Sequence, residues 1–169
     1  MRIALAALCV AASACSAPAP RCDLSVTRDL AFTDAQMLDS LTARAIGPSC
    51  DKAIGVYDLR TADGHPIWAW TSPLQRAFGD VFPAAEPEAM TDFLERWAQP
   101  TLTTTQQAPD WPLLAPGQTT LDRLTYDDIR ARDLPMLCHA SGTARETCVF
   151  WEPAAGGAGH LLDRDAEPS

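Results

Sequence analysis

Four cysteines constrain the fold of this chain more than any other feature of its sequence. Cys22, Cys50, Cys138 and Cys148 all follow an apolar N-terminal segment. In an oxidising compartment an even number of cysteines forms disulfides, and four cysteines allow three pairings. We expect the bonds Cys22–Cys50 and Cys138–Cys148, because each pair brackets a plausible hairpin.

The hairpin around the second pair is the better defined. Residues 134–140 and 147–151 are strand-like, and the turn-forming residues Ser141, Gly142 and Thr143 separate them. Pairing Cys138 with Cys148 places apolar residues opposite each other on both faces, as antiparallel strands prefer. The facing pairs are Met136 with Phe150 and Leu137 with Val149. For Cys22 and Cys50 the sequence predicts the bond without a register.

Residues 1–14 have the pattern of an export signal. Arg2 supplies a positive start, and residues 3–12 form an apolar run. This run is too short to span a bilayer, which needs about 20 residues. A short apolar run that ends in small residues is typical of a signal peptide.

The residues Ser13, Ala14 and Cys15 resemble the lipobox of bacterial lipoproteins, although Ala12 stands where that family prefers leucine. The resemblance implies that Cys15 carries a thioether-linked diacylglycerol and an amide-linked acyl chain, and so anchors the protein in a membrane. Ser16 favours the outer membrane under the enterobacterial sorting rule. The alternative is ordinary cleavage after Ala14, which would release a soluble periplasmic or secreted protein.

Lipidation agrees with the cysteine count. Cleavage of the signal removes Cys9, and acylation uses the thiol of Cys15, so four free thiols are left to form two disulfides. We expect residues 15–21 to form a lipidated tether, residues 22–163 a single domain and residues 164–169 a flexible tail. The layout is similar to that of uncharacterised envelope lipoproteins of GC-rich Gram-negative bacteria, which carry no activity over to this chain.

The domain is predicted to be α+β, with a mainly antiparallel sheet, one principal helix packed on it, and disulfide staples. Alternating apolar residues predict strands, and Asp63-Gly64 is a strong hairpin signal. The expected strands cover residues 22–32, 41–45, 53–59 and 67–70, the hairpin at 134–151, and an edge strand at 160–162.

The principal helix should begin at Pro87 and end before Pro100. One apolar stripe defines its buried face, and it consists of Met90, Phe93, Leu94 and Trp97. We also expect a helical turn over 74–78, a β-prone run over 101–107, and a short helix that ends near Arg132 and is capped by Thr125 with Asp128.

The net charge of −9 restricts the partners. Nucleic-acid binding needs clustered Lys and Arg, so we expect no nucleic-acid partner. An acidic surface favours a basic protein or another envelope partner. The membrane is expected as a partner only through the lipid anchor.

Several side chains are candidates for chemistry, but none forms a specific motif. His65 lies in a turn, His139 has Glu146 nearby, and His160 is three residues from Asp163. A zinc set of His139 and His160 with Cys138 and Cys148 matches no tight ligand spacing. We therefore predict no catalytic residues, no metal and no cofactor.

Trp68 and Trp70 alternate on one face of a predicted strand. They are expected to meet Trp97 in the core, with Trp151 at its rim. The functional alternative is an aromatic face that binds a glycan or a peptide.

These observations predict a cell-envelope lipoprotein, facing the periplasm, that acts as a binding or accessory module. Enzyme activity stays open. The first alternative is a lysozyme-inhibitor-like protein, since lysozyme is a basic target. The second is an envelope hydrolase with His65 or His139 as the base.

Overall fold

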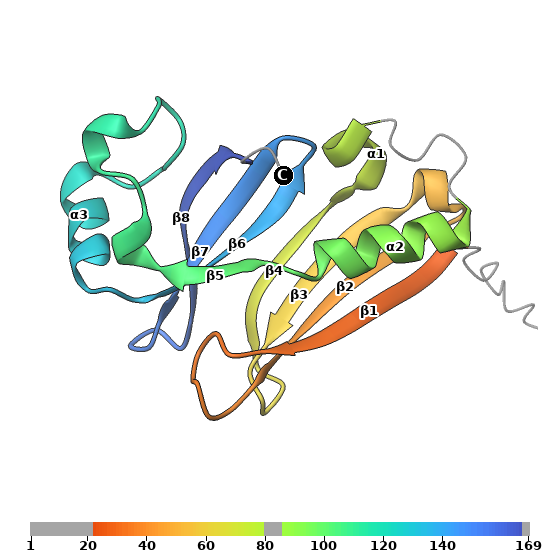
Figure 1. Ribbon diagram of the computed structural model, residues 1–169, viewed down its shortest axis with the longest axis horizontal. Coiled ribbons are helices and arrows are strands. Elements are labelled where there is room, and N and C mark those ends of the chain that lie inside the picture. Colours follow the sequence, from red (N-terminus) through yellow and green to blue (C-terminus); the bar gives the residue numbers. More distant parts are fainter. Residues whose placement is uncertain (1–21, 80–85, 167–169) are drawn as a thin grey trace, which may run out of the picture.

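The computed structural model describes residues 22–79 and 86–166. The expected signal peptide, the lipidated Cys15 and most of the expected C-terminal tail lie outside this range. Eight strands form two antiparallel sheets of four strands each, and each sheet keeps its strands in chain order (Figure 1). The predicted α+β class is therefore confirmed.

The first sheet contains the strands of the N-terminal half. They are β1 (Cys22–Leu30), β2 (Asp39–Gly47), β3 (Ile54–Arg60) and β4 (Pro66–Pro73). The second sheet contains β5 (Thr101–Thr104), β6 (Pro135–Gly142), β7 (Arg145–Glu152) and β8 (Gly157–Asp165). The helices are α1 (Leu74–Phe78), α2 (Pro87–Trp97) and α3 (Arg123–Ala131).

Helix α2 packs on the first sheet, as the apolar stripe predicted. Met90, Leu94 and Trp97 are buried against β1 and β2. Gly55 of β3 lies under Trp97, the last residue of the helix. A Cβ at Gly55 would lie 3.0 Å from Cη2 of Trp97 and even closer to Leu74. Glycine is therefore needed for the close approach of Trp97 to β3.

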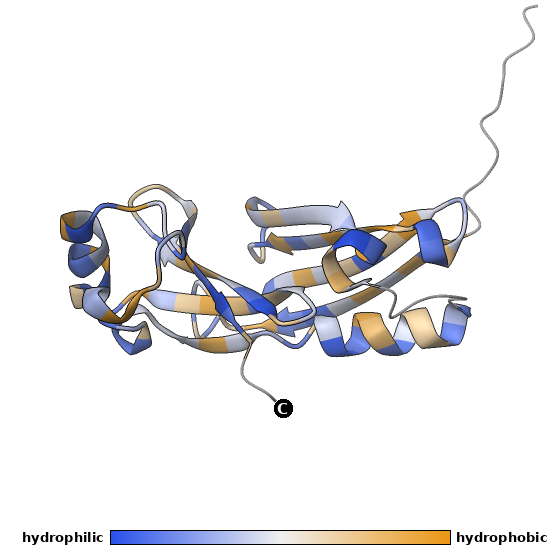
Figure 2. Cartoon of the chain, turned by 90° about the horizontal axis from the view of Figure 1, so that it is seen from above, coloured by the Kyte–Doolittle hydropathy of each residue, from blue (hydrophilic) through white to orange (hydrophobic). Residues whose placement is uncertain are grey.

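The second sheet is covered on both faces. Leu137 and Val149 belong to the core shared with the first sheet and α2. Met136 and Phe150 point the other way, into a second core under α3. Helices α2 and α3 lie toward opposite ends of the long axis, and bands of hydrophobic and hydrophilic residues alternate along α2 (Figure 2). Strands β6 and β7 are apolar on both faces because they lie between these two cores.

Both predicted disulfides form. Cys22–Cys50 joins the start of β1 to the 3₁₀ turn that follows β2, and Cys138–Cys148 crosses from β6 to β7. Cys138 faces Cys148 in the ladder, so the predicted facing of Met136 with Phe150 and of Leu137 with Val149 is also confirmed.

Other details differ from the sequence predictions. The strands divide into two sheets rather than one, and α3 covers the second. Thr125 does not cap α3, because Asp122 is the N-cap and its carboxylate accepts from Thr125 N at 3.0 Å. Aspartate and threonine are both common N-cap residues, and the N-cap of α3 is Asp122, three residues before the predicted Thr125.

The boundaries of several strands also shift. The strand expected over 22–32 ends at Leu30, and β2 is longer than the predicted 41–45 at both ends. Only residues 101–104 of the β-prone run are a strand. The last strand extends to Asp165, past the expected start of the tail, because it pairs with β7 along its length.

None of the described helices is long and apolar enough to cross a membrane.

Candidate functional site

An aromatic junction holds the two sheets together. Tyr57 of β3 stacks on His139 of β6, with ring centroids 4.3 Å apart. Trp97 of α2 donates a hydrogen bond from Nε1 to the carbonyl oxygen of Ala140, at 2.8 Å. Trp68 of β4 donates from its Nε1 to Nε2 of His139, at 3.2 Å. Side chains from β3, β4 and α2 therefore fix one strand of the second sheet.

His139 is a structural acceptor in this junction. It is 1% exposed, and the indole N–H of Trp68 can only donate, so Nε2 must be unprotonated. Its Nδ1 then carries the proton and donates to Ala140 O at 3.0 Å. Burial lowers the pKa of His139 to about 4. Glu146, its expected partner, instead accepts a hydrogen bond from Arg164.

The tryptophan pair of β4 faces the junction and is half-buried. Trp68 contacts His139, whereas Trp70 packs edge-on against Trp97 with ring centroids 5.5 Å apart. Trp97 is buried in the core, and Trp68, Trp70 and Trp151 are partly buried against it. The expected meeting of Trp68 and Trp70 with Trp97 therefore lies at the margin of the core rather than inside it.

Tyr57 completes the junction without a polar partner. Its hydroxyl is buried and forms no hydrogen bond within the part of the chain that the structure describes. Burial raises the pKa of Tyr57, so the phenol stays protonated. The junction therefore holds neutral groups and provides packing rather than acid–base chemistry.

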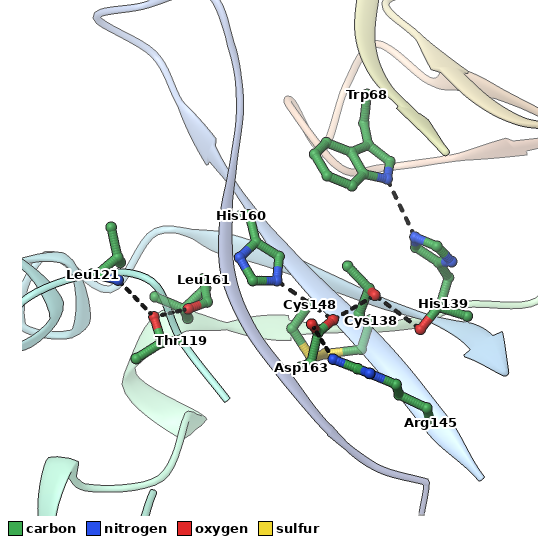
Figure 3. Close-up of polar contacts among 12 residues, drawn as sticks. Trp68, Thr119, Leu121, Cys138, His139, Arg145, Cys148, His160, Leu161 and Asp163 are labelled. Atoms are coloured by element: carbon green, nitrogen blue, oxygen red, sulfur yellow. Dashed lines mark hydrogen bonds and ion pairs between the residues drawn. A yellow bond between two sulfur atoms is a disulfide. The ribbon is translucent and has the colours of Figure 1, made fainter. Parts of the chain in front are cut away.

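A polar network lies on the second sheet around Asp163 (Figure 3). Thr147 Oγ1 and Arg145 donate to its carboxylate, each at 2.7 Å. His160 Nε2 lies 3.4 Å from the same carboxylate, and Ser141 Oγ lies 2.9 Å from Thr147 Oγ1. Burial alone would raise the pKa of Asp163, but these hydrogen bonds and the nearby positive groups outweigh it and lower the pKa.

This network does not assemble a nucleophile. Ser141 contacts Thr147, and no hydrogen bond joins a serine to a histidine among residues 22–79 and 86–166. The thiols of Cys138 and Cys148 are consumed in the disulfide, so they cannot ligate zinc with His139 or His160. The described residues also contain no group of three or more His, Cys, Asp or Glu arranged to hold a metal ion.

The best candidate for a binding site is a cleft where loops of the first sheet meet Trp151 of β7. Its volume is about 290 Å³. The β1–β2 loop and the β3–β4 loop lie together at one end of the first sheet (Figure 1). The described lining consists of Thr33, Asp34, Met37, Asp39, Thr61, Ala62, Asp63, His65 and Trp151. We call it the Trp151 cleft.

Asp39 fixes one wall of the Trp151 cleft. It is 1% exposed, and its Oδ2 accepts from the backbone N–H groups of Phe32, at 3.1 Å, and Thr33, at 2.7 Å. Its Oδ1 accepts from Thr33 Oγ1 at 2.8 Å. These bonds close the β1–β2 loop onto the start of β2 and hold the wall in place.

Two other carboxylates in the Trp151 cleft are exposed and available. Asp34 uses Oδ1 to accept from Gln36 N at 2.6 Å, which fixes the side chain in an Asx turn. Asp63 lies in the tight turn of the β3–β4 hairpin, and none of the ion pairs among the described residues includes it. The nearby Arg60 is engaged with Asp58 at 2.6 Å and with the carbonyl of Gly64.

The lining of the Trp151 cleft is thus one-sided in charge. It contains three carboxylates, and neither Lys nor Arg occurs among its described residues. Glu152, next to Trp151, is already paired with Arg132 at 2.6 Å and 2.7 Å. Met37 adds an apolar contribution, with 58% of its surface exposed. A cation with an apolar stem matches these surroundings.

Sequence reasoning did not find this cleft. Of its lining residues, the sequence marks Asp63 as part of a hairpin turn, His65 as a candidate base and Trp151 as a rim residue, and it marks none of them as part of a shared site. The aspartates of the two loops indicate turns in the sequence, but they do not indicate a cleft. The cleft also needs Trp151, which lies on β7 of the other sheet. His65 lines the cleft, whereas His139 is sealed in the junction.

No protein-family model, curated protein or solved structure matched this chain. Its function must therefore be argued from its own residues.

The junction predicts an acid-sensitive fold. The pKa of His139 is lower in the folded state than its unfolded value of about 6.5, so neutral His139 stabilises the fold above that pH. The contribution is lost as the pH falls toward about 4. Between pH 7 and pH 5 the loss should be about 2 kcal/mol.

The measurement is urea unfolding of the native protein and of His139→Gln at both pH values. The native protein should lose about 2 kcal/mol more on acidification than the variant does. Equal losses in the two proteins would show that His139 is not buried as a neutral acceptor.

Proposed function

We propose that this protein is an exported lipoprotein of the cell envelope that acts as a binding module, with the Trp151 cleft as its docking site. The observation that carries the proposal is the cleft itself, whose described lining contains three aspartates and a tryptophan but neither Lys nor Arg. Binding requires a preformed concave surface with a few placed polar groups, and this cleft provides one.

The disulfides support the export part of the proposal. Both bonds link cysteines that are almost fully buried. Structural disulfides persist in oxidising compartments such as the periplasm and are rare in the cytosol. An export signal at residues 1–14 would deliver the chain to such a compartment.

The position of the Trp151 cleft supports a display role. The described chain begins at Cys22, at one end of β1, and Leu30 at the other end leads into the β1–β2 loop of the cleft. Nine residues of strand separate these ends by about 27 Å. A tether over residues 15–21 would therefore hold the molecule by one end of the first sheet and present the cleft at the other.

Lysozyme is the specific target that we propose for this module. It is a basic protein, and the acidic lining of the Trp151 cleft is complementary to it. This lysozyme-inhibitor-like role rests on charge alone. An envelope hydrolase finds less support, because His65 has no serine partner among the described hydrogen bonds.

The anchor is tested with Cys15→Ser in the full chain. The variant should move from the membrane fraction to the soluble fraction, because the acyl chains can no longer be attached. Cys9→Ser is the matched control, since Cys9 lies inside the predicted signal and its loss should leave the protein in the membrane. Retention of Cys15→Ser in the membrane would contradict the lipoprotein assignment.

The target is tested by adding the purified protein to lysozyme and following cell-wall hydrolysis. Inhibition is expected, and Asp63→Asn should weaken it about tenfold by removing one unpaired carboxylate from the Trp151 cleft. Asp51→Asn changes the net charge equally at the opposite end of the first sheet and should inhibit like the native protein. If lysozyme keeps full activity, it is not the target.

A further inference from the structure

The buried carboxylate of Asp39 has no counter-charge within residues 22–79 and 86–166. Its partners are two backbone N–H groups and one hydroxyl, all from its own loop. Buried charges in proteins are usually paired with an opposite charge or bound to a metal. No cationic side chain forms an ion pair with Asp39 among the described residues. Its negative charge therefore adds to the field inside the Trp151 cleft.

The exposed carboxylates extend this field to the mouth of the Trp151 cleft. Asp34 keeps its Oδ2 free of any described hydrogen bond, and the Asp63 carboxylate has neither a donor nor an ion-pair partner there. Three carboxylates of one sign line one concave surface, so their fields add and attract a cation more strongly than a single surface carboxylate would.

The apolar part of the lining selects the shape of the cation. Trp151 and Met37 provide surface for an alkyl stem, and an indole attracts a guanidinium or an ammonium group. The described lining lacks the ligand cluster of a metal site. A volume of about 290 Å³ is at the lower end for ligand sites, so it accommodates a side chain better than a glycan chain.

From these contacts we infer that the Trp151 cleft is a socket for an arginine side chain of a basic partner protein. The guanidinium would lie between Asp34 and Asp63, and its stem against Trp151. Arginine fits better than a compact ammonium because its planar fork can bind carboxylates in pairs and stack on an aromatic ring. The exposed side chains of Met37 and Leu38 at the same loop would contact residues beside the arginine.

This inference rests on the docking role proposed above, but it is tested separately from location and target. The purified full chain is titrated with a short peptide of alanines around one arginine, and with the same peptide carrying citrulline. Citrulline keeps the size and shape of arginine but has no charge. Binding is followed by calorimetry and by tryptophan fluorescence.

The arginine peptide should bind at least tenfold more tightly than the citrulline peptide, and salt should weaken its binding. Asp34→Asn and Asp63→Asn should each reduce the affinity about tenfold. Both changes preserve the turns, because asparagine also forms Asx turns and Asn-Gly hairpins. Asp51→Asn, the matched control away from the cleft, should bind like the native protein.

Two further results complete the test. Trp151→Phe should remove the fluorescence change on binding, since this is the indole of the cleft. Free arginine amide should bind more weakly than the peptide, because it lacks the neighbouring contacts to Met37 and Leu38.

Equal binding of the citrulline peptide would overturn the inference, as would a loss of affinity in Asp51→Asn as large as that in Asp63→Asn. Equal affinity for free arginine amide would make the cleft a site for small cations instead. A failure of membrane anchoring or of lysozyme inhibition would leave the arginine socket intact, so the proposals fail separately.

Discussion

The contact between His139 and the aromatic side chains of the first sheet is the interaction on which the rest of the structure depends. The indole N–H groups of Trp68 and Trp97 each donate a hydrogen bond to β6, to His139 Nε2 and to Ala140 O. Tyr57 stacks on the imidazole of His139. Because an indole N–H buried without an acceptor would cost about 1–3 kcal/mol, these bonds fix the orientation of one sheet on the other.

The Trp151 cleft is a consequence of that orientation. Its acidic loops belong to the first sheet and its indole belongs to the second, so neither sheet contains the site by itself. The junction fixes β6, which pairs with β7, the strand that contains Trp151. The Cys138–Cys148 bond links β6 to β7, so the junction also positions Trp151. A rigid framework that positions surface loops is a common basis for specific binding.

Much of the fold could be predicted from local patterns, but the site could not. The hairpin at 134–151 was predictable because two cysteines and two apolar pairs agreed on one register. Alternation identifies which face of a strand is buried, but it does not say which sheet covers that face, so the division into two sheets was missed. The cleft brings Trp151 next to loop residues that lie about 90 to 120 positions earlier in the chain. Local spacing in the sequence cannot predict a contact over that separation. Asp39 illustrates the difficulty, since its burial follows from a loop that closes around it.

Hydrogen exchange of the indole N–H groups, measured by NMR, tests the junction most directly. The account predicts that the N–H groups of Trp68 and Trp97 exchange as slowly as the backbone amides of the central strands, because their release requires the two sheets to separate. The indole of Trp151, at the cleft, should exchange much faster. Rapid exchange at Trp68 and Trp97 in the native protein would contradict the account, because the sheets would then not be held by these bonds.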